Sequence, residues 1–484
     1  MSHADNNAFA ELMRIRGMGE PAEGEVRIDG SDPFYATPFR VASTTAGSIA
    51  AAAVAANDLW ELRTGRRQRI QLDLRAAAAT VRTVDYTRAR GPDGNYVTVP
   101  IPQAMNHMIS VTQPWQARDG RWVLPHLNLP RLSERVLGVL QCESTPAAVA
   151  EAVSRWDAQA LEDAIAQAGA CGGMIRTPQE WLEHPQGQYL AGRPVVEITR
   201  VGDAPPQPMS GGNRPLDGVR VLDLTRILAG PVAGRTLAEH GAEVLMVTAP
   251  HLPQTPEHVR DTSHGKRSCF LDLRQAGEAE RMRALLAQAD VFIDGYRPGK
   301  LAELGFGADE LLRLRPGLVH LSVSCFGSGG PFAGRPGWEQ VAQAVTGVCH
   351  VQGKLVNGGR PGLVFAPMCD YTTGYLGAFG VMLALARRAR EGGSYRVHVS
   401  LCQSAMLTQR QGLAENFAQA PQRLDAETLQ AYSVDSDTVY GALRTLGPVV
   451  RMSETPPRWA RPTPELGSDL PQWLDKGTNR RTAQ

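Results

Sequence analysis

Asp370 is the residue of this sequence whose type and position best suit chemistry. It stands in the stretch FAPMCDYTTGYLGAFGVMLALARR, which starts at Phe365, at the junction of an apolar strand-like run and an apolar helix. A carboxylate in such a place caps a helix, pairs with a charge or acts as a nucleophile. Aspartate is ionised at neutral pH, and the small residues that follow leave room for a substrate. Free N–H groups in the first helical turn would stabilise a developing negative charge.

A repeat within the chain bears on the capping interpretation. The segment from Ala42 aligns without gaps to the segment from Cys369, with the constant offset 374 − 47 = 392 − 65 = 327. Both copies predict a cap, a helix, a glycine turn and a strand, and Ser43 stands where Asp370 stands. Serine and aspartate are both good N-caps. Because Ser43 needs no charge to cap its helix, the carboxylate of Asp370 is available for another role.

Alternating strand and helix patterns from Gly218 onward predict the framework that would position Asp370. The buried runs VRVLDL, EVLMV, CFLDL, DVFIDGY and LVHLSVS are typical of strands, and helical patterns such as residues 275–289 lie between several of them. This order predicts an α/β fold with a doubly wound, mostly parallel, Rossmann-like sheet, accompanied by a smaller α+β domain.

The sequence divides into five predicted segments. They are an N-terminal tail with the first repeat helix (1–84), a small α+β domain (85–200), a Pro/Gly-rich linker (201–217), a large α/β domain (218–410) and a loop with a C-terminal return segment (411–484). The linker prediction depends on GDAPPQPMSGGNRPLDG, which has no periodicity.

Composition excludes several classes of function. The formal net charge of +1 gives no electrostatic case for nucleic acid or for a membrane surface. The longest apolar run, Ile49 to Ala56, is too short to span a bilayer, and the first residues have no signal-peptide core. The seven cysteines are scattered singly without metal-ligand spacing, so we expect no metal site and a cytoplasmic location.

The motifs together resemble the class III coenzyme A transferases, the CaiB/BaiF family. LDGVRVLDLTRILAGPVAGRTLAEHGAEVLMV is similar to the family's N-terminal signature, and GKRSCFLDLR, ADVFIDGYRPGKLAELGFG and CDYTTGYLGAFGVMLALARR follow in the family's order. The segment order departs from the family pattern, because here the small-domain segment precedes the large-domain signature. The chain therefore resembles two incomplete copies with complementary missing parts, or one permuted copy.

The resemblance implies a chemistry for Asp370, which matches the family's nucleophile. Asp370 would attack an acyl-CoA thioester, form an acyl-aspartyl anhydride and then an aspartyl-CoA thioester, and pass CoA to an acceptor acid. Glu339, in PGWEQVAQ, matches an acidic position near the active site, although a helix-start glutamate explains it equally well. CoA would be a substrate and no cofactor would be tightly bound. Family members form interlocked dimers, so we expect a homodimer.

The resemblance also implies where CoA would bind. RILAGP leads from a strand into a helix N-terminus, where α/β sheets bind ligands, but it does not complete the dinucleotide fingerprint GxGxxG. Ala249 stands where some family members place a phosphate-binding arginine. The positions that match CoA contacts are Leu228, Ala229, Leu271, Arg274, Gly295, Tyr296 and Arg297.

Two alternatives stay open from the sequence. The first is an α-methylacyl-CoA racemase or isomerase; Trp338 disfavours it, because the racemases carry a proton-transferring histidine there and tryptophan exchanges no such proton. The second is a CoA-binding paralogue without turnover, which the rearranged order and Ala249 favour. The sequence does not name the donor or acceptor acid.

Overall fold

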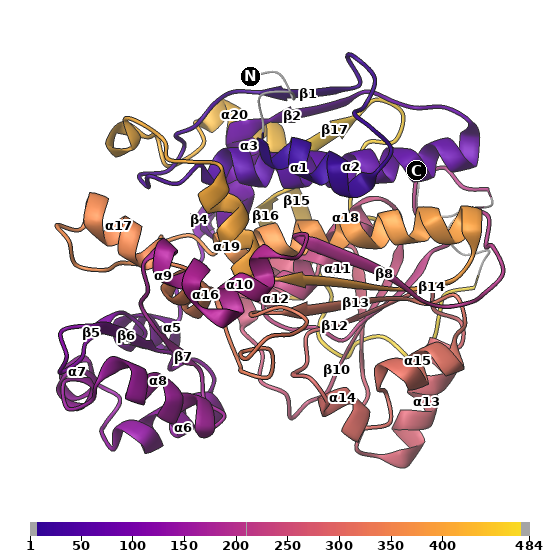
Figure 1. Cartoon of the computed structure of the whole chain (residues 1–484). Helices are drawn as coiled ribbons and strands as arrows, with labels where there is room; N and C mark the ends of the chain where they lie inside the picture. The colour runs from indigo at the N-terminus through magenta and orange to yellow at the C-terminus, as the bar shows by residue number, and fades with distance from the viewer. Residues whose placement is uncertain (1–6, 210, 476–484) are drawn as a thin grey trace.

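The computed structural model describes residues 7–209 and 211–475 (Figure 1). Parts of three predicted segments lie outside the described residues: 1–6 of the tail, 210 of the linker and 476–484 of the return segment.

A seven-stranded sheet forms the centre of the structure, in the order β11-β10-β9-β12-β13-β14-β8. All neighbouring strands are parallel except β8, which runs antiparallel to β14. This architecture confirms the predicted α/β fold. The strands are β8 (Val196–Gly202), β9 (Arg220–Asp223), β10 (Glu243–Thr248), β11 (Lys266–Phe270), β12 (Val291–Asp294), β13 (Val319–Ser324) and β14 (Ser394–Ser400).

Both faces of this sheet are buried, which explains why its strands are nearly continuous apolar runs. Neighbouring residues of β9 point to opposite faces: Val221 belongs to the core cluster that includes α11 (Ala229–Glu239) and α18 (Met368–Glu391), whereas Leu222 belongs to a second cluster with α13 (Ala276–Leu286). Figure 1 shows α11 and α18 on one side of the sheet and α13, α14 (Lys300–Glu303) and α15 (Ala308–Leu314) on the other.

The two repeat helices pack against each other. These are α2 (Val41–Thr64) and α18, each of 24 residues, which lie side by side above the sheet in Figure 1. Residues Ala50 to Ala56 of α2 are at most 2% exposed, which confirms the prediction that this helix is buried like its counterpart. The repeat continues past the helices, because β2 (Ile70–Asp73) and α3 (Leu74–Ala79) follow α2 as β14 and α19 (Leu401–Arg410) follow α18.

A small lobe, residues 103–174, has its own hydrophobic core. It consists of a three-stranded sheet, order β5-β6-β7, and four helices. Its elements are α5 (Gln103–Val111), β5 (Trp115–Gln116), β6 (Trp122–Pro125), α6 (Pro130–Leu140), α7 (Pro146–Val153), α8 (Ala158–Gln167) and β7 (Gly172–Met174).

The rest of the predicted segment 85–200 belongs to other sheets. A four-stranded sheet consists of β3 (Arg88–Arg90), β4 (Tyr96–Thr98), β15 (Ser433–Thr438) and β16 (Gly441–Leu446). The strand β8 forms one edge of the large sheet. Strand pairing between distant segments leaves no local signal in the sequence, which is why the predicted segment and the small lobe differ. The limits of the five segments as domains stay a prediction.

The remaining elements connect these layers. They are α1 (Asn7–Arg16), β1 (Val26–Asp29), η2 (Thr80–Arg82), α4 (Thr83–Tyr86), α9 (Pro178–Glu183), α10 (Pro185–Ala191), α12 (Pro256–Thr262), α16 (Glu339–Val345), α17 (Val348–Val356), η3 (Phe417–Gln419), α20 (Ala426–Tyr432) and β17 (Val450–Met452). Among the helices in the described ranges, none combines the length and the apolar character that a membrane crossing needs.

Candidate active site

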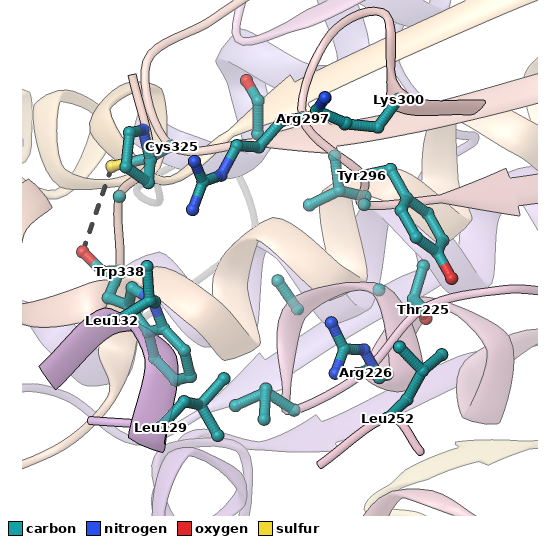
Figure 2. A pocket seen from close by; sticks show the side chains of 18 of the residues that line it. Leu129, Leu132, Thr225, Arg226, Leu252, Tyr296, Arg297, Lys300, Cys325 and Trp338 are labelled. Carbon is teal, nitrogen blue, oxygen red and sulfur yellow. Dashed lines mark hydrogen bonds between the residues drawn. The ribbon is translucent and has the colours of Figure 1, made fainter. Parts of the chain in front are cut away.

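A cavity of about 780 Å³ opens at the carboxyl ends of β9 and β12 (Figure 2). These two strands are neighbours although β10 and β11 separate them in sequence, so the strand order reverses between them. Such a reversal leaves a crevice beyond the strand ends, where open α/β sheets bind ligands. The loop after β9 and the loop after β12 form one side of the cavity, and the start of α6 in the small lobe closes it from outside.

Most of the residues predicted for the site line this cavity. They are Leu228, Ala229, Arg274, Gly295, Tyr296, Arg297 and Asp370. Leu271 does not line it: the side chain is 3% exposed and packs in the core cluster with Leu245 and Leu285. The strand β11 ends at Phe270, and Leu271, two residues after the buried Cys269, packs into the same core cluster as Cys269. Glu339 lies behind the cavity wall, in contact with Asp370.

Asp370 is the third residue of α18 and does not cap it. The N-cap position is Pro367, no side-chain cap is present, and the residues before the helix form no strand, so the predicted strand–helix junction is wrong. The Asp370 side chain is 8% exposed, and no described residue donates a hydrogen bond to its carboxylate. Burial first, and the charge of Glu339 second, raise the pKa of Asp370 well above its ordinary value. The neighbours Met368 and Cys369 are each 1% exposed, whereas Phe365 is 42% exposed.

Glu339 supplies the cap that Asp370 does not. It is the first residue of α16, and its Oε2 accepts a hydrogen bond from the backbone N–H of Asp370 at 2.7 Å. Its Oε1 accepts a second from Gln343 Nε2, also at 2.7 Å. Burial raises the pKa of Glu339. Two buried carboxyl groups therefore lie next to each other, one bound to a helix end and the other free.

The repeat has the same arrangement at its other copy. Ser43 is the third residue of α2, and the backbone N–H groups of Ala42 and Ser43 donate to the carboxylate of Asp32 at 3.2 and 3.0 Å. In both copies a carboxylate from another segment caps the helix. A charge at the third helical position is therefore not needed for the fold, as Ser43 demonstrates, and the capping interpretation of Asp370 is wrong.

The other charged side chains of the cavity are mostly cations. Arg274 pairs with Asp272, Lys300 with Glu303, and Arg335 with Asp163. Within the described chain the remaining four have no acidic partner at ion-pair distance: Arg131, Arg135, Arg226 and Arg297. Asp370 is the one acidic residue among the described lining residues. Guanidinium groups without acidic partners suit phosphate oxygens.

Several of these lining residues were missed from the sequence. Arg226 is the first residue of the motif RILAGP, and Lys300 directly follows YRPG. Their positions in these motifs were a signal from which both residues could have been predicted. No such signal marks Leu129, Leu132 or the arginines of α6, because nothing local in the sequence shows that the small lobe closes this cavity. Ile227 has φ 75, which is exceptional for a β-branched residue and turns the chain from β9 into α11 at the cavity wall.

Trp338 and Cys325 form the wall next to the carboxyl pair. Cys325 Sγ donates to the carbonyl oxygen of Trp338 at 3.9 Å, the dashed line of Figure 2. Burial raises the pKa of Cys325 well above its ordinary value, so it is a protonated thiol and a poor nucleophile. The Trp338 ring stacks on His126, with centroids 4.9 Å apart. His126 does not line the cavity, and burial lowers its pKa to about 4, which makes it a neutral support for the tryptophan.

Parts of this chain are similar to known proteins. Residues 216–440 match the family model described as CoA-transferase family III. An acyl-CoA transferase of Gibberella moniliformis is 32% identical over 360 residues, 65% of this chain and 63% of that protein. The succinyl-CoA:glutarate CoA-transferase of Mus musculus is 33% identical over 218 residues, 42% of this chain and 50% of that protein.

One of the solved structures that resemble part of this chain comes from a bacterium. A CaiB/BaiF family protein from Brucella suis is 21% identical, with a TM-score of 0.44 over 53% of this chain and 97% of that one. This chain spans between about half and 63% of the length of the curated relatives just described. The family to which residues 216–440 of this chain are similar is therefore CoA-transferase family III.

Proposed function

We propose that this chain is a CoA-transferase, which moves coenzyme A from an acyl-CoA donor to a carboxylic acid acceptor with Asp370 as the nucleophile. The observation that carries the proposal is the free carboxylate of Asp370. It is buried, caps nothing, and lies in a cavity whose other charged lining groups are cations, among the described residues. The names of the relatives, acyl-CoA transferase and succinyl-CoA:glutarate CoA-transferase, support this class of reaction.

The proposed reaction begins with attack on the donor. A carboxylate oxygen of Asp370 attacks the thioester carbonyl carbon, the C–S bond breaks, and CoA leaves as a thiolate from an acyl-aspartyl anhydride. The thiolate then attacks the aspartyl carbonyl of the anhydride, which releases the donor acid as a carboxylate and leaves an aspartyl-CoA thioester. Each step conserves charge, because one anion attacks and one anion leaves.

The second half reverses this sequence with the acceptor. The acceptor carboxylate attacks the aspartyl thioester, which forms a new anhydride and releases CoA thiolate. The thiolate attacks the acceptor's carbonyl carbon, and the new acyl-CoA leaves while Asp370 is restored. Glu339 is the proposed positioning residue, since its hydrogen bond to the Asp370 N–H fixes the first turn of α18.

The cationic side of the cavity is the proposed site for the CoA phosphates. Arg226, Arg274, Tyr296 and Arg297 surround it from the loops after β9, β11 and β12. Leu228 and Ala229 stand at the start of α11, whose first backbone N–H groups have no partner within the helix. The residue at the family's arginine position, Ala249, is buried and offers no charge, so these arginines would replace that contact.

Two substitutions test the proposal directly. Asp370→Ser copies the other repeat, and Asp370→Asn is the closest isostere; CoA transfer should fall to background in both, because neither side chain carries CoA through an anhydride. Turnover above about a tenth of wild type, a loss of roughly 1.4 kcal/mol or less of transition-state stabilisation, would show that Asp370 is not the nucleophile. CoA binding that persists in a wild type without transfer would instead favour the inactive paralogue.

Location and assembly belong to this proposal too. A reducing cytoplasm suits the seven free cysteines. A homodimer is the expected assembly, although α2 and α18 already pair within one chain. A measurement of the protein's mass in solution tests whether it forms a homodimer.

A further inference from the structure

The hydroxyl of Tyr371, the residue after Asp370, connects parts of the structure that are far apart in the sequence. It donates a hydrogen bond to Asp261 Oδ2 of α12 at 2.7 Å. Thr83 Oγ1 of α4, 288 residues away in the sequence, lies 2.7 Å from the same hydroxyl. Because a phenol has one proton and Asp261 accepts it, the Thr83 hydroxyl donates to Tyr371. The first turn of α18 is therefore bound to α12 and to the segment that follows the first repeat copy.

This hydrogen-bond network is buried, and one cation faces its carboxylate. Arg235 Nη1 of α11 donates to Asp261 Oδ1 at 2.9 Å. The four residues are each at most 3% exposed. Burial first, and the charge of Asp261 second, raise the pKa of Tyr371 well above its ordinary value, so its hydroxyl stays a neutral donor. Buried polar groups are costly unless they are hydrogen-bonded, so the network favours one position of the Tyr371 side chain.

Among the described residues, the other repeat copy forms no such network. The repeat offset, 371 − 44 = 327, places Thr44 opposite Tyr371 as it places Ser43 opposite Asp370. Thr44 is 1% exposed, like Tyr371, but its Oγ1 donates to the carbonyl oxygen of Arg40 at the start of its own helix, at 2.9 Å. A buried repeat helix therefore needs no contact of this kind. The copy that has the network is the copy that has the free carboxylate.

We propose that Tyr371 is a positioning residue for CoA transfer. Its hydroxyl, held between α12 and α4, fixes the first turn of α18 and with it the carboxylate of Asp370. Glu339 of α16 holds the same turn through the backbone N–H of Asp370. Tyr371 does not line the cavity, so it acts through Asp370 and not on the substrate. Attack on a thioester is sensitive to small displacements of the nucleophile. The inference rests on the proposed function, which makes Asp370 that nucleophile.

A steady-state assay of the full chain, with an acyl-CoA donor and a carboxylic acid acceptor, tests this role. Tyr371→Phe keeps the ring and removes the hydroxyl; we expect kcat to fall about tenfold while the KM for the acyl-CoA stays within about twofold. Thr83→Val should also lower kcat, and Thr83→Ser, which keeps the hydroxyl, should restore it. The double variant Y371F/T83V should be no slower than Y371F, because Thr83 acts through the Tyr371 hydroxyl.

Tyr375→Phe is the matched control. Tyr375 is buried on the same helix, one turn further from Asp370, and its hydroxyl hydrogen-bonds the side chain of Thr80. Y375F should keep kcat within about twofold of wild type, since it removes a similar hydrogen bond away from the nucleophile. A kcat of Y371F within about twofold of wild type, or an equal loss of kcat in Y375F, would overturn the positioning role.

Hydrogen exchange separates this inference from the proposed function, because it needs no turnover. Amides of residues 368–374 should exchange about tenfold faster in Y371F and T83V than in wild type, and at the wild-type rate in T83S. Unchanged exchange in Y371F would show that the hydroxyl does not hold the turn, whatever happens at Asp370. A wild type that transfers no CoA, or an active Asp370→Asn, would overturn the proposed function. Faster exchange in Y371F would then still show that Tyr371 fixes the first turn of α18.

Discussion

The backbone N–H of Asp370 donates to Glu339 Oε2 at 2.7 Å, so the acid that caps α18 belongs to α16 and the carboxylate of Asp370 stays free. In the other repeat, Asp32 accepts a hydrogen bond from the backbone N–H of Ser43 in the same way. The start of that helix is therefore capped although its third residue is not an acid. A buried carboxylate without a hydrogen-bond donor is unfavourable for stability. This unfavourable burial fits the role of nucleophile that we propose for Asp370.

Removal of the neighbouring charge should shift the pH dependence of transfer. The charge of Glu339 raises the pKa of Asp370 in addition to burial, so Glu339→Gln should lower that pKa while burial keeps it above the ordinary range. Because the nucleophile must be ionised, activity rises with pH through this pKa, and the acid limb of the profile should move to lower pH. A pH–rate profile of kcat/KM measures it; an acid limb that stays in place or moves upward would show that the two carboxyls do not interact.

Asp370 should reduce folding stability at neutral pH. Its pKa is raised in the folded state, so the folded protein binds the extra proton, and stability falls as pH rises above the unfolded pKa of about 4. Asp370→Asn should therefore unfold at a higher temperature than wild type at pH 8. The difference should shrink as pH falls toward 4. Thermal unfolding at both pH values measures it, and a variant clearly less stable at pH 8 would assign Asp370 a structural role.

The reaction should exchange no α-proton. Trp338 occupies the cavity wall next to Glu339, and its ring offers no group that accepts and returns a proton from carbon. His126, behind that ring, is buried and has a pKa lowered to about 4. Incubation of the protein with a 2-methylacyl-CoA in deuterated water should leave the α-position unlabelled. Enzyme-dependent incorporation of deuterium would favour the racemase.

The sequence predicted the large sheet well, because the strands that are buried on both faces are continuous apolar runs with helices between them. It also predicted the burial of α2, since that helix is apolar on all sides. Prediction from the sequence was wrong or incomplete where contacts between distant segments determine the structure. Nothing local shows that Glu339 reaches the start of α18 or that β8 joins the large sheet. Leu271 lies outside the cavity lining, because its side chain packs in the same core cluster as Cys269, and its contact with CoA stays a prediction.

The central claim is that Asp370 carries CoA covalently. Incubation of the full chain with an acyl-CoA, followed by intact mass measurement and peptide mapping, tests it most directly. The account predicts a CoA adduct, or an acyl adduct from the anhydride, on the peptide that contains Asp370, and no adduct in Asp370→Asn. Transfer by the wild type without any adduct on that peptide, or an adduct that survives in the variant, would contradict it.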